Sequence, residues 1–336
     1  MILVTGGTGF IGSHLLLHLL ENDEKVRAIY RNSKSISKTK NLFSLYAKAS
    51  LFDKIEWIEA DVTDIPSLEI AFRDIEFVYH CAALVSFDPK DEARLRKINI
   101  EGTANIVNFS LQYDVKKLCY VSSIAALGDL PEYESAITET TEWNPEQYHS
   151  DYAISKYGAE MEVWRAQQEG LDVVIINPGV VLGAGFFDSG SGELFNAIAT
   201  GLKFYSKGNT GFVGIADVVA IAYVLMKSDF NAERFILVSE TISFEEITNK
   251  IATALNVKPP YIDAKKWMSE VAWRFDWMFS NLFFRKRKLS KAMATAMQST
   301  DFYSNEKIKN AIIFEFTPID EVIKTTVAFF KIKANF

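Results

Sequence analysis

The chain has 336 residues, with 36 Lys and Arg against 43 Asp and Glu, and a formal net charge of −7. Hydrophobic residues make up 49% and charged residues 24%, which indicates a globular protein with a sizeable core and excludes a mainly disordered chain. The acidic excess argues against a general nucleic-acid binder, so we expect no nucleic-acid partner. At about 150 residues per domain, the length favours two domains or one large α/β domain with an appendage.

The cysteines and the first residues of the chain bear on its cellular compartment. Cys81 and Cys119 each lie in an apolar run, which predicts buried thiols in a reducing compartment. The first apolar run starts at Ile2, directly after Met1, and leaves no room for a targeting peptide. No stretch of about 18 uncharged apolar residues is present that could span a membrane. These features predict a cytoplasmic protein.

Short apolar, β-branched runs alternate with amphipathic segments through the first two thirds of the chain. The predicted strands are 2–5, 26–30, 55–60, 77–81, 117–122 and 172–177. Strands that alternate with helices require right-handed crossovers and a parallel sheet covered on both faces. The sequence therefore predicts an α/β fold with a Rossmann-type doubly wound parallel sheet.

The last third has a different character. Residues 182–214 are rich in glycine and predict irregular chain beside a site, and helical patterns dominate after about Ile236. We therefore expect a smaller, mostly helical C-terminal substrate domain. The expected division is a dinucleotide-binding domain of 1–178 joined by 213–236, and a substrate-binding domain of 179–212 and 237–336.

The run Thr-Gly-Gly-Thr-Gly-Phe-Ile-Gly at 5–12 lies between the first predicted strand and a helix. Glycines at 6, 9 and 12 permit a tight turn, close approach of the backbone to a pyrophosphate, and close packing of helix on strand. The amides and the dipole of the helix N-terminus then favour phosphate. In this context the motif predicts a dinucleotide cofactor rather than a simple turn.

The end of the second strand distinguishes NAD from NADP. A carboxylate there would bind the ribose 2′-hydroxyl, whereas an arginine would accept a 2′-phosphate. Arg31 follows the strand, Lys34 lies nearby, and no carboxylate is present. These residues favour NADP, with NAD possible, over the alternative of a solvated basic loop. After the third strand, Asp61 and Val62 are placed to meet the adenine.

Taken together, these motifs resemble the extended short-chain dehydrogenase/reductase family, also called the NAD-dependent epimerase/dehydratase family, over most of the chain. Besides the glycine loop, the segments that carry the resemblance are Asp61-Val62, His80-Cys81-Ala82-Ala83, Asn99-Ile100-Glu101-Gly102-Thr103, Val121-Ser122-Ser123, Tyr152-Ala153-Ile154-Ser155-Lys156 and Asn177-Pro178-Gly179. The resemblance implies cofactor contacts at Gly6, Thr8, Gly9, Phe10, Ile11, Gly12, Arg31, Asp61, Val62, Ala82, Tyr152, Lys156 and Pro178.

The Tyr-x-x-x-Lys spacing carries little information here, because six of the 13 tyrosines have Lys four residues later. Position selects Tyr152, at the start of a helical segment 29 residues beyond Ser123. The resemblance implies that Tyr152 donates a proton to the carbonyl oxygen while Lys156 lowers the phenol pKa and binds the nicotinamide ribose. It also implies that Ser123 holds the substrate oxygen and that Asn99 completes a proton relay. The alternative is an exposed helix pair.

Histidine chemistry is not expected to contribute. His80 faces the predicted cofactor cleft, and a packed or backbone-bonded histidine is favoured there over a catalytic base. The chain has four histidines and no clustered Cys/His spacing, so no metal site is expected.

Differences between this sequence and other branches of the family narrow the choice of reaction. Ile124 and Ala125 follow Ser123 where the family's dehydratases carry an acidic pair, and the epimerases' diphosphate-binding Arg is missing just before Phe212. The segments 26–31, 233–237 and 302–307 resemble the branch of dihydroflavonol-4-reductase-like and 3β-hydroxysteroid-dehydrogenase-like enzymes. This branch implies an NADPH-dependent reductase of an apolar ketone or aldehyde, or oxidation of the alcohol. A nucleotide-sugar epimerase, with Asn177 on the diphosphate, and a non-catalytic cofactor sensor are the alternatives.

An aromatic segment, 267–284, precedes four basic residues at 285–288. Val271, Phe275, Met278, Phe279 and Leu282 recur at helical spacing and form one apolar stripe. Burial of the stripe against the small domain is favoured, ahead of a helix that lines an apolar substrate pocket. Attachment to a membrane surface is disfavoured by the acidic balance of the chain. The expected partner is a small-molecule substrate, and a homodimer is a possible assembly.

Overall fold

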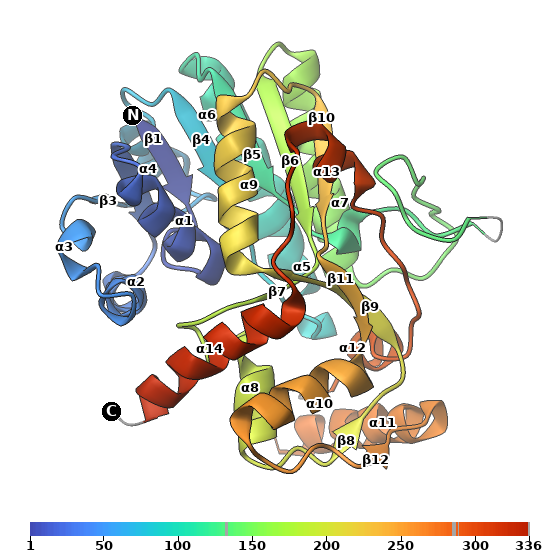
Figure 1. Ribbon diagram of the computed structural model, residues 1–336. Coiled ribbons are helices and arrows are strands. Elements are labelled where there is room, and N and C mark those ends of the chain that lie inside the picture. The colour runs from blue at the N-terminus through green and yellow to red at the C-terminus, as the bar shows by residue number, and fades with distance from the viewer. Residues whose placement is uncertain (132–133, 284–286, 288, 335–336) are drawn as a thin grey trace.

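The computed structural model describes residues 1–131, 134–283, 287 and 289–334 (Figure 1). Its centre is a seven-stranded parallel sheet in the order β10-β6-β5-β4-β1-β2-β3. The strands are β1 (Ile2–Thr5), β2 (Val26–Tyr30), β3 (Glu56–Glu59), β4 (Phe77–His80), β5 (Lys117–Val121), β6 (Asp172–Pro178) and β10 (Glu233–Leu237). The six predicted strands and the doubly wound Rossmann-type sheet are confirmed.

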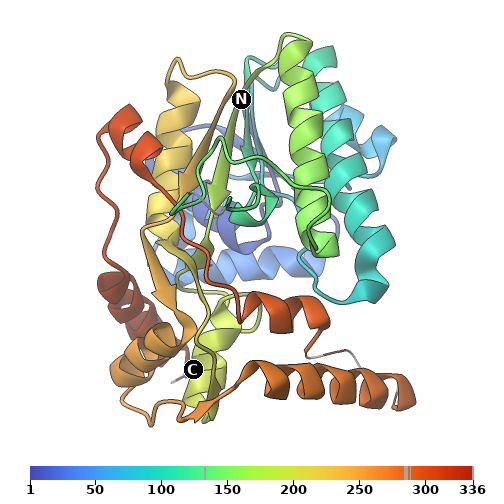
Figure 2. The ribbon, with the colours of Figure 1, turned by 90° about the vertical axis from the view of Figure 1, so that its right-hand side faces the viewer.

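Helices cover both faces of this sheet (Figures 1 and 2). Helices α1 (Phe10–Glu21) and α9 (Ile215–Lys227) pack against each other on one face. The other face is covered by α4 (Ile65–Ala71), α6 (Gly102–Gln112) and α7 (Asp151–Gln168). The sandwich brings α9 and β10, from late in the chain, onto the same sheet as β1.

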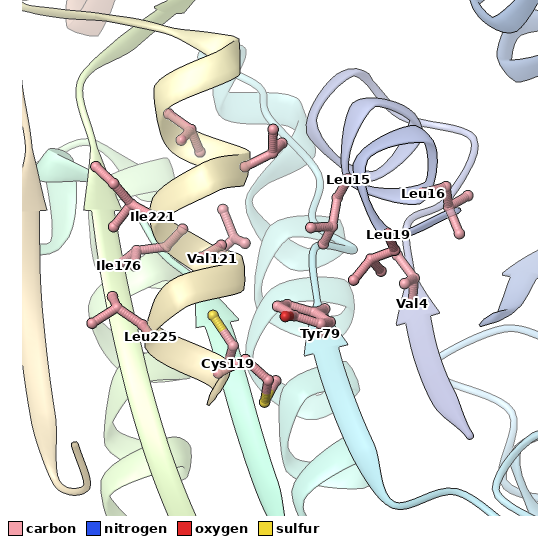
Figure 3. Close-up of a cluster of buried hydrophobic side chains, with 14 of the residues drawn as sticks. Val4, Leu15, Leu16, Leu19, Tyr79, Cys119, Val121, Ile176, Ile221 and Leu225 are labelled. Carbon is pink, nitrogen blue, oxygen red and sulfur yellow. The ribbon is translucent and has the colours of Figure 1, made fainter. Parts of the chain in front are cut away.

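The core between α1, α9 and the sheet is aliphatic (Figure 3). Leu15 and Leu19 of α1 and Ile221 and Leu225 of α9 are almost completely buried above the sheet. In each helix the two side chains are four residues apart and therefore lie on one face, and the helices pack through that face. This packing fixes where α1 begins, directly after the glycine loop.

Shorter elements connect or flank the sheet. They are α2 (Ser33–Leu45), α3 (Ala49–Phe52), α5 (Glu92–Leu95), a π-helical segment (Arg96–Glu101), α13 (Glu306–Ile312) and 3₁₀ turns at Pro89–Asp91 and Ile124–Ala126. Both cysteines are free thiols, with Cys119 fully buried and Cys81 partly buried. Within the described residues, no helix has the length and apolarity needed to cross a bilayer.

A second, smaller and mostly helical unit lies beyond the lower end of the sheet in Figure 1. Its own core, in which Phe195 and Ile251 are fully buried, joins α8, α10 and α14 to a three-stranded sheet. Its elements are β7 (Val180–Leu182), α8 (Gly192–Ala199), β8 (Phe204–Tyr205), β9 (Asn209–Gly214), β11 (Glu240–Ser243), α10 (Phe244–Leu255), β12 (Ile262–Asp263), α11 (Lys266–Leu282), α12 (Lys291–Ala296) and α14 (Ile319–Ala334).

Candidate active site

The glycine loop turns tightly between β1 and α1. Gly6 has φ of +69°, and a Cβ on it would lie 2.7 Å from the Ala82 nitrogen. A Cβ on Gly12 would lie 2.2 Å from the Gly6 carbonyl oxygen. Both positions therefore require glycine, the first for its backbone conformation and both for close packing. The contact also places Ala82, which follows β4, directly beside the loop.

The start of α1 is open. Gly9 is the N-cap and supplies no side-chain acceptor to the first helical amides, and its own surface is exposed. Thr8 precedes it, and Phe10 and Ile11 form the first turn. Backbone N–H groups at an uncapped helix N-terminus fit a phosphate. The loop thus has the geometry required to hold a dinucleotide, with Gly6, Gly9 and Gly12 forming the cradle.

Arg31 and Asp61 lie just beyond the carboxyl ends of β2 and β3. Arg31 is 59% exposed, and its guanidinium lies 3.8 Å from the Asp61 carboxylate. Asp61 also accepts hydrogen bonds from the Thr63 amide and hydroxyl, each at 2.9 Å. Val62 packs against Gly102, where a Cβ would lie 2.7 Å from Val62 Cγ2. Lys34 is exposed in the first turn of α2.

His80 lies at the carboxyl end of β4 and is fully buried. Thr103 Oγ1 donates to the Asn99 carbonyl at 2.6 Å and therefore accepts from His80 Nε2 at 2.9 Å. His80 Nδ1 then accepts from Thr5 Oγ1 at 2.7 Å. Burial, aided by the charge of Lys156, lowers the pKa of His80 to about 3. The residue is a neutral, packed histidine, bonded to two threonines rather than to backbone.

Ser123 and Tyr152 come together above the ends of β5 and α7. Ser123 follows β5 and caps a short 3₁₀ turn, where its Oγ accepts from the Ala125 amide at 3.1 Å. Tyr152 lies in the first turn of α7, close enough to Ser123 for that side chain to lower the pKa of Tyr152. The ring of Phe87 meets the Tyr152 ring edge-on, at 5.7 Å between centroids. Two side chains with hydroxyl groups are thus neighbours, beside the ring of Phe87.

Lys156 lies one turn further along α7 and is 1% exposed. Its Nζ donates to the Tyr120 hydroxyl at 2.7 Å and to the Val121 carbonyl at 2.9 Å. These two bonds leave the third ammonium hydrogen for another acceptor, such as a cofactor ribose. Pro178, the last residue of β6, is buried at the same carboxyl edge of the sheet.

The pKa of Tyr152 is shifted in the direction opposite to the one expected from Lys156. Burial raises the pKa of Tyr152, and only the hydrogen bond from Ser123 opposes this effect. Burial also lowers the pKa of Lys156 to about 7, although the nearby Glu160 carboxylate raises it. Desolvation outweighs attraction because both side chains lie inside the protein.

Asn99, expected in a proton relay, makes other contacts. Its Oδ1 accepts from the Leu84 amide at 2.7 Å, and its Nδ2 donates to the Leu84 carbonyl and to Ser155 Oγ, each at 2.9 Å. Ser155 Oγ in turn donates to the Tyr152 carbonyl at 2.8 Å. Asn99 therefore ties the segment after β4 to α7, and the relay stays a prediction.

Three further residues support the site and were not singled out from the sequence for this role. Glu160, fully buried one turn beyond Lys156, accepts from Asn177 Nδ2 at 2.6 Å and from the Arg234 guanidinium at 3.2 Å. Asn177 Nδ2 also donates to the Ser123 carbonyl at 3.0 Å. Glu160 lies eight residues after Tyr152 and four after Lys156, so helical spacing could have placed all three on one face of α7. Asn177 is fully buried, and its Oδ1 has no hydrogen-bond partner among the described residues.

A cavity of about 920 Å³ adjoins Tyr152. Phe87, which contacts the Tyr152 ring, lines it, as do Ser150 and Asp151 just before Tyr152. The remaining lining residues are Ser86, Pro89, Tyr148, Val271, Trp273, Arg274, Phe275, Trp277, Met278, Arg287, Lys291 and Ala292. Most of these side chains are apolar or aromatic, which is typical of small-molecule sites.

The aromatic segment forms α11, but its stripe is not buried. Val271, Phe275, Met278, Phe279 and Leu282 are 42–65% exposed. Among described elements the helix packs mainly against α12, seen beside it in Figure 2. Burial of the stripe, favoured by the sequence, is therefore wrong because none of the described elements covers it, and three of these residues line the cavity instead. Phe284, Arg285, Lys286 and Lys288 lie outside the described residues.

The sequence pattern of the NAD-dependent epimerase/dehydratase family matches residues 2–235. The chain belongs to this family. The resemblance drawn from the glycine loop and Tyr152 is confirmed, and the family is one of NAD-dependent enzymes.

Curated relatives agree with the reductase-like branch. The chain is 31% identical to tetraketide alpha-pyrone reductase 2 of Arabidopsis thaliana over 73% of this chain and 79% of the relative. It is 30% identical to sterol demethylase protein B of Methylococcus capsulatus over 73% and 71%, respectively. It is 25% identical to the bifunctional dihydroflavonol 4-reductase/flavanone 4-reductase of Malus domestica over 84% and 88%.

Solved structures show the same fold along the whole chain. The structure of gox2253 has a TM-score of 0.82 at 24% identity and covers 100% of this chain and 99% of its own. UDP-glucose 4-epimerase of Thermotoga maritima, solved with UDP-glucose, has a TM-score of 0.77 at 21% identity, with 99% of both chains covered. At these identities the likeness concerns the fold alone.

Proposed function

We propose that this protein reduces the ketone or aldehyde of an apolar small molecule, using NADPH. The observation that carries the proposal is that Ser123 and Tyr152 are neighbours beside a largely apolar cavity, whose lining includes Phe87, Ser150 and Asp151. The presence of reductases among the sequence relatives also supports the proposal. The missing acidic pair after Ser123 and the buried Asn177 disfavour dehydratase and epimerase chemistry.

The chemistry divides between cofactor and protein. Held at the glycine loop, the cofactor supplies the hydride. Ser123 and Tyr152 hydrogen-bond the carbonyl oxygen, and Tyr152 donates the proton that completes the alcohol. The raised pKa of Tyr152 suits this role, because the hydroxyl remains protonated at neutral pH. Lys156, when charged, stabilises the tyrosinate that forms as the proton leaves.

Arg31 supports the choice of NADPH. Its guanidinium is exposed at the end of β2, where a 2′-phosphate would displace the long contact to Asp61. A bidentate guanidinium–phosphate interaction is stronger than a 3.8 Å ion pair on the surface. NADH, which lacks that phosphate, would leave the ion pair in place.

An assay of NADPH oxidation with cyclic ketones, aromatic aldehydes and aliphatic ketones tests the proposal. We expect turnover with the apolar carbonyl compounds and none with UDP-glucose or UDP-galactose. Interconversion of the two UDP-sugars without net NADPH consumption would establish the epimerase alternative. Tight NADPH binding with no turnover of either class would instead favour a cofactor-sensing protein.

A further inference from the structure

Helix α11 exposes far more apolar surface than its neighbours. Four large side chains on it that do not line the cavity, Trp267, Phe279, Leu282 and Phe283 at its C-cap, are 42–65% exposed. At 3.6 residues per turn they fall within one half of the helix circumference. Together with the exposed cavity-lining Val271, Phe275 and Met278, they form a continuous apolar stripe, named here the α11 stripe.

The segment around this stripe is strongly basic in an acidic protein. Residues 265–291 contain eight Lys and Arg and two Asp and Glu, whereas the whole chain has a net charge of −7. Lys265 and Lys266 are exposed at the start of the helix, and Lys291 follows its end.

The two acidic residues of the segment are engaged locally. Glu270 forms an ion pair with Arg274 at 2.5 Å, and Asp276 accepts a hydrogen bond from the Leu289 amide at 3.1 Å. In the described part of the segment, five basic residues therefore outnumber these two acids, in contrast to the acidic balance of the whole chain; they are Lys265, Lys266, Arg274, Arg287 and Lys291.

We propose that α11 lies on the surface of a bilayer that contains anionic phospholipid. An amphipathic helix with Trp and Phe on its apolar face and flanking lysines is suited to the interface of lipid head groups and acyl chains. Anionic head groups complement the positive segment, whereas the negative remainder of the protein is repelled from the membrane. The helix lies on the bilayer without crossing it, consistent with its 17 residues.

A second copy of the chain is a poorer occupant of the stripe. A two-fold dimer through α11 would place the basic segment of one copy against that of the other, because both partners present the same surface. Like charges at such close range oppose association.

The position of α11 on the bilayer would also connect the membrane with the cavity beside Tyr152. Val271, Phe275 and Met278 belong to both the stripe and the cavity wall, so apolar surface is continuous from the membrane side to the neighbourhood of Tyr152. An apolar substrate dissolved in the bilayer could enter by this route. This last step rests on the proposed function, whereas lipid binding does not.

Co-sedimentation of the full-length protein with vesicles tests the proposal. We expect it to pellet with vesicles of equal parts phosphatidylglycerol and phosphatidylcholine, and far less with phosphatidylcholine alone. Raising the salt to about 1 M, where screening acts within about 3 Å, should weaken the binding several-fold. The readout needs no turnover, so failure of the reductase proposal would leave it interpretable.

Two variants locate the binding surface. Trp267→Ser/Phe279→Ser/Phe283→Ser should lower partitioning onto anionic vesicles about tenfold or more. The matched control, Ile65→Ser/Ile70→Ser/Val224→Ser, removes exposed apolar side chains elsewhere and should bind as the parent does. Lys265→Glu/Lys266→Glu should also weaken binding, whereas Lys25→Glu/Lys54→Glu, with the same change of net charge, should have a much smaller effect.

Several results would overturn the proposal. One is a parent protein that stays in the supernatant with anionic vesicles at low salt. Another is equal loss of binding in the stripe variant and its apolar control. A concentration-dependent dimer in light scattering that dissociates in the stripe variant, without vesicle binding, would assign the stripe to a second copy of the chain.

Discussion

The two sides of the candidate site, named here the Tyr152 wall and the α11 wall, are built in opposite ways. The Tyr152 wall is the buried polar cluster around Tyr152, and the α11 wall is the part of the cavity lining that α11 supplies. On the Tyr152 wall, Lys156, Glu160 and Asn177 are almost completely buried and hydrogen-bonded at 2.6–3.2 Å. On the α11 wall, the side chains are about half exposed, and the helix packs mainly against one short neighbour. Proton transfer requires atoms fixed within tenths of an ångström, whereas an apolar surface can recognise apolar groups without such precision.

This contrast predicts that substitutions on the two walls will differ in kind. Changes on the Tyr152 wall should affect chemistry and stability together, because each polar group there supports another. Changes on the α11 wall should affect substrate binding with little cost in stability.

Tyr152→Phe should have the largest effect. Removal of the proton donor should lower kcat for carbonyl reduction by about 10²–10⁴-fold, with NADPH affinity nearly unchanged. NADPH oxidation and fluorescence titration measure the two quantities. Tyr113→Phe, at another tyrosine with Lys four residues later, is the control and should retain full activity. Unchanged turnover in Tyr152→Phe would show that another group donates the proton.

Glu160→Gln tests whether the buried support of Lys156 matters. It leaves Arg234 without its carboxylate partner, and we expect a loss of about 3 kcal/mol in the free energy of unfolding. Because Glu160 raises the pKa of Lys156, its loss should lower that pKa further below its usual value. Lys156 is charged below its pKa, so the decline of kcat/KM with rising pH should move to lower pH.

The partly exposed Glu162→Gln, two residues along the same helix, is the control for Glu160→Gln. It should change stability by less than about 1 kcal/mol and leave the pH profile in place. A Glu160→Gln variant that lost stability but kept the parent's pH profile would reduce Glu160 to a purely structural residue.

Arg31→Ala tests the exposed end of the cofactor cleft. Loss of the guanidinium should weaken NADPH binding about tenfold and leave NADH binding within about twofold, since only NADPH carries the 2′-phosphate. Titration of both cofactors measures this, with Arg73→Ala as the control at an exposed arginine elsewhere. Equal affinities for NADPH and NADH in the parent would contradict the preference.

Phe275→Ala should have the smallest effect. The ring lines the cavity but is 53% exposed, so KM for an apolar substrate should rise a few-fold while stability changes by about 0.5 kcal/mol. Phe72→Ala, in the closed core of α4 and α6, should by contrast cost about 3–5 kcal/mol. Thermal unfolding and steady-state kinetics compare the two. A large stability loss in Phe275→Ala would mean that α11 is held as firmly as the core.

Much of the cofactor half could be predicted from the sequence because its signals are local. Strand and helix periods placed the six strands, and glycines at 6, 9 and 12 marked the turn before α1. Position relative to Ser123 selected Tyr152, and the structure brings these two side chains near each other. Each of these depends on residues close in sequence or on a fixed order of strands.

Only the tertiary structure decided the features that depend on contacts between residues far apart in the sequence. Glu160 meets Arg234, which is 74 residues away, and Asn177 donates a hydrogen bond to the same carboxylate. Burial, set by the whole fold, raises the pKa of Tyr152 where the sequence predicted a fall. The α11 stripe has the spacing of a packed helix, but spacing cannot report whether another element exists to cover it. In this protein the sequence alone predicted the fold and selected the candidate residues, and tertiary contacts determined their electrostatics and the open wall.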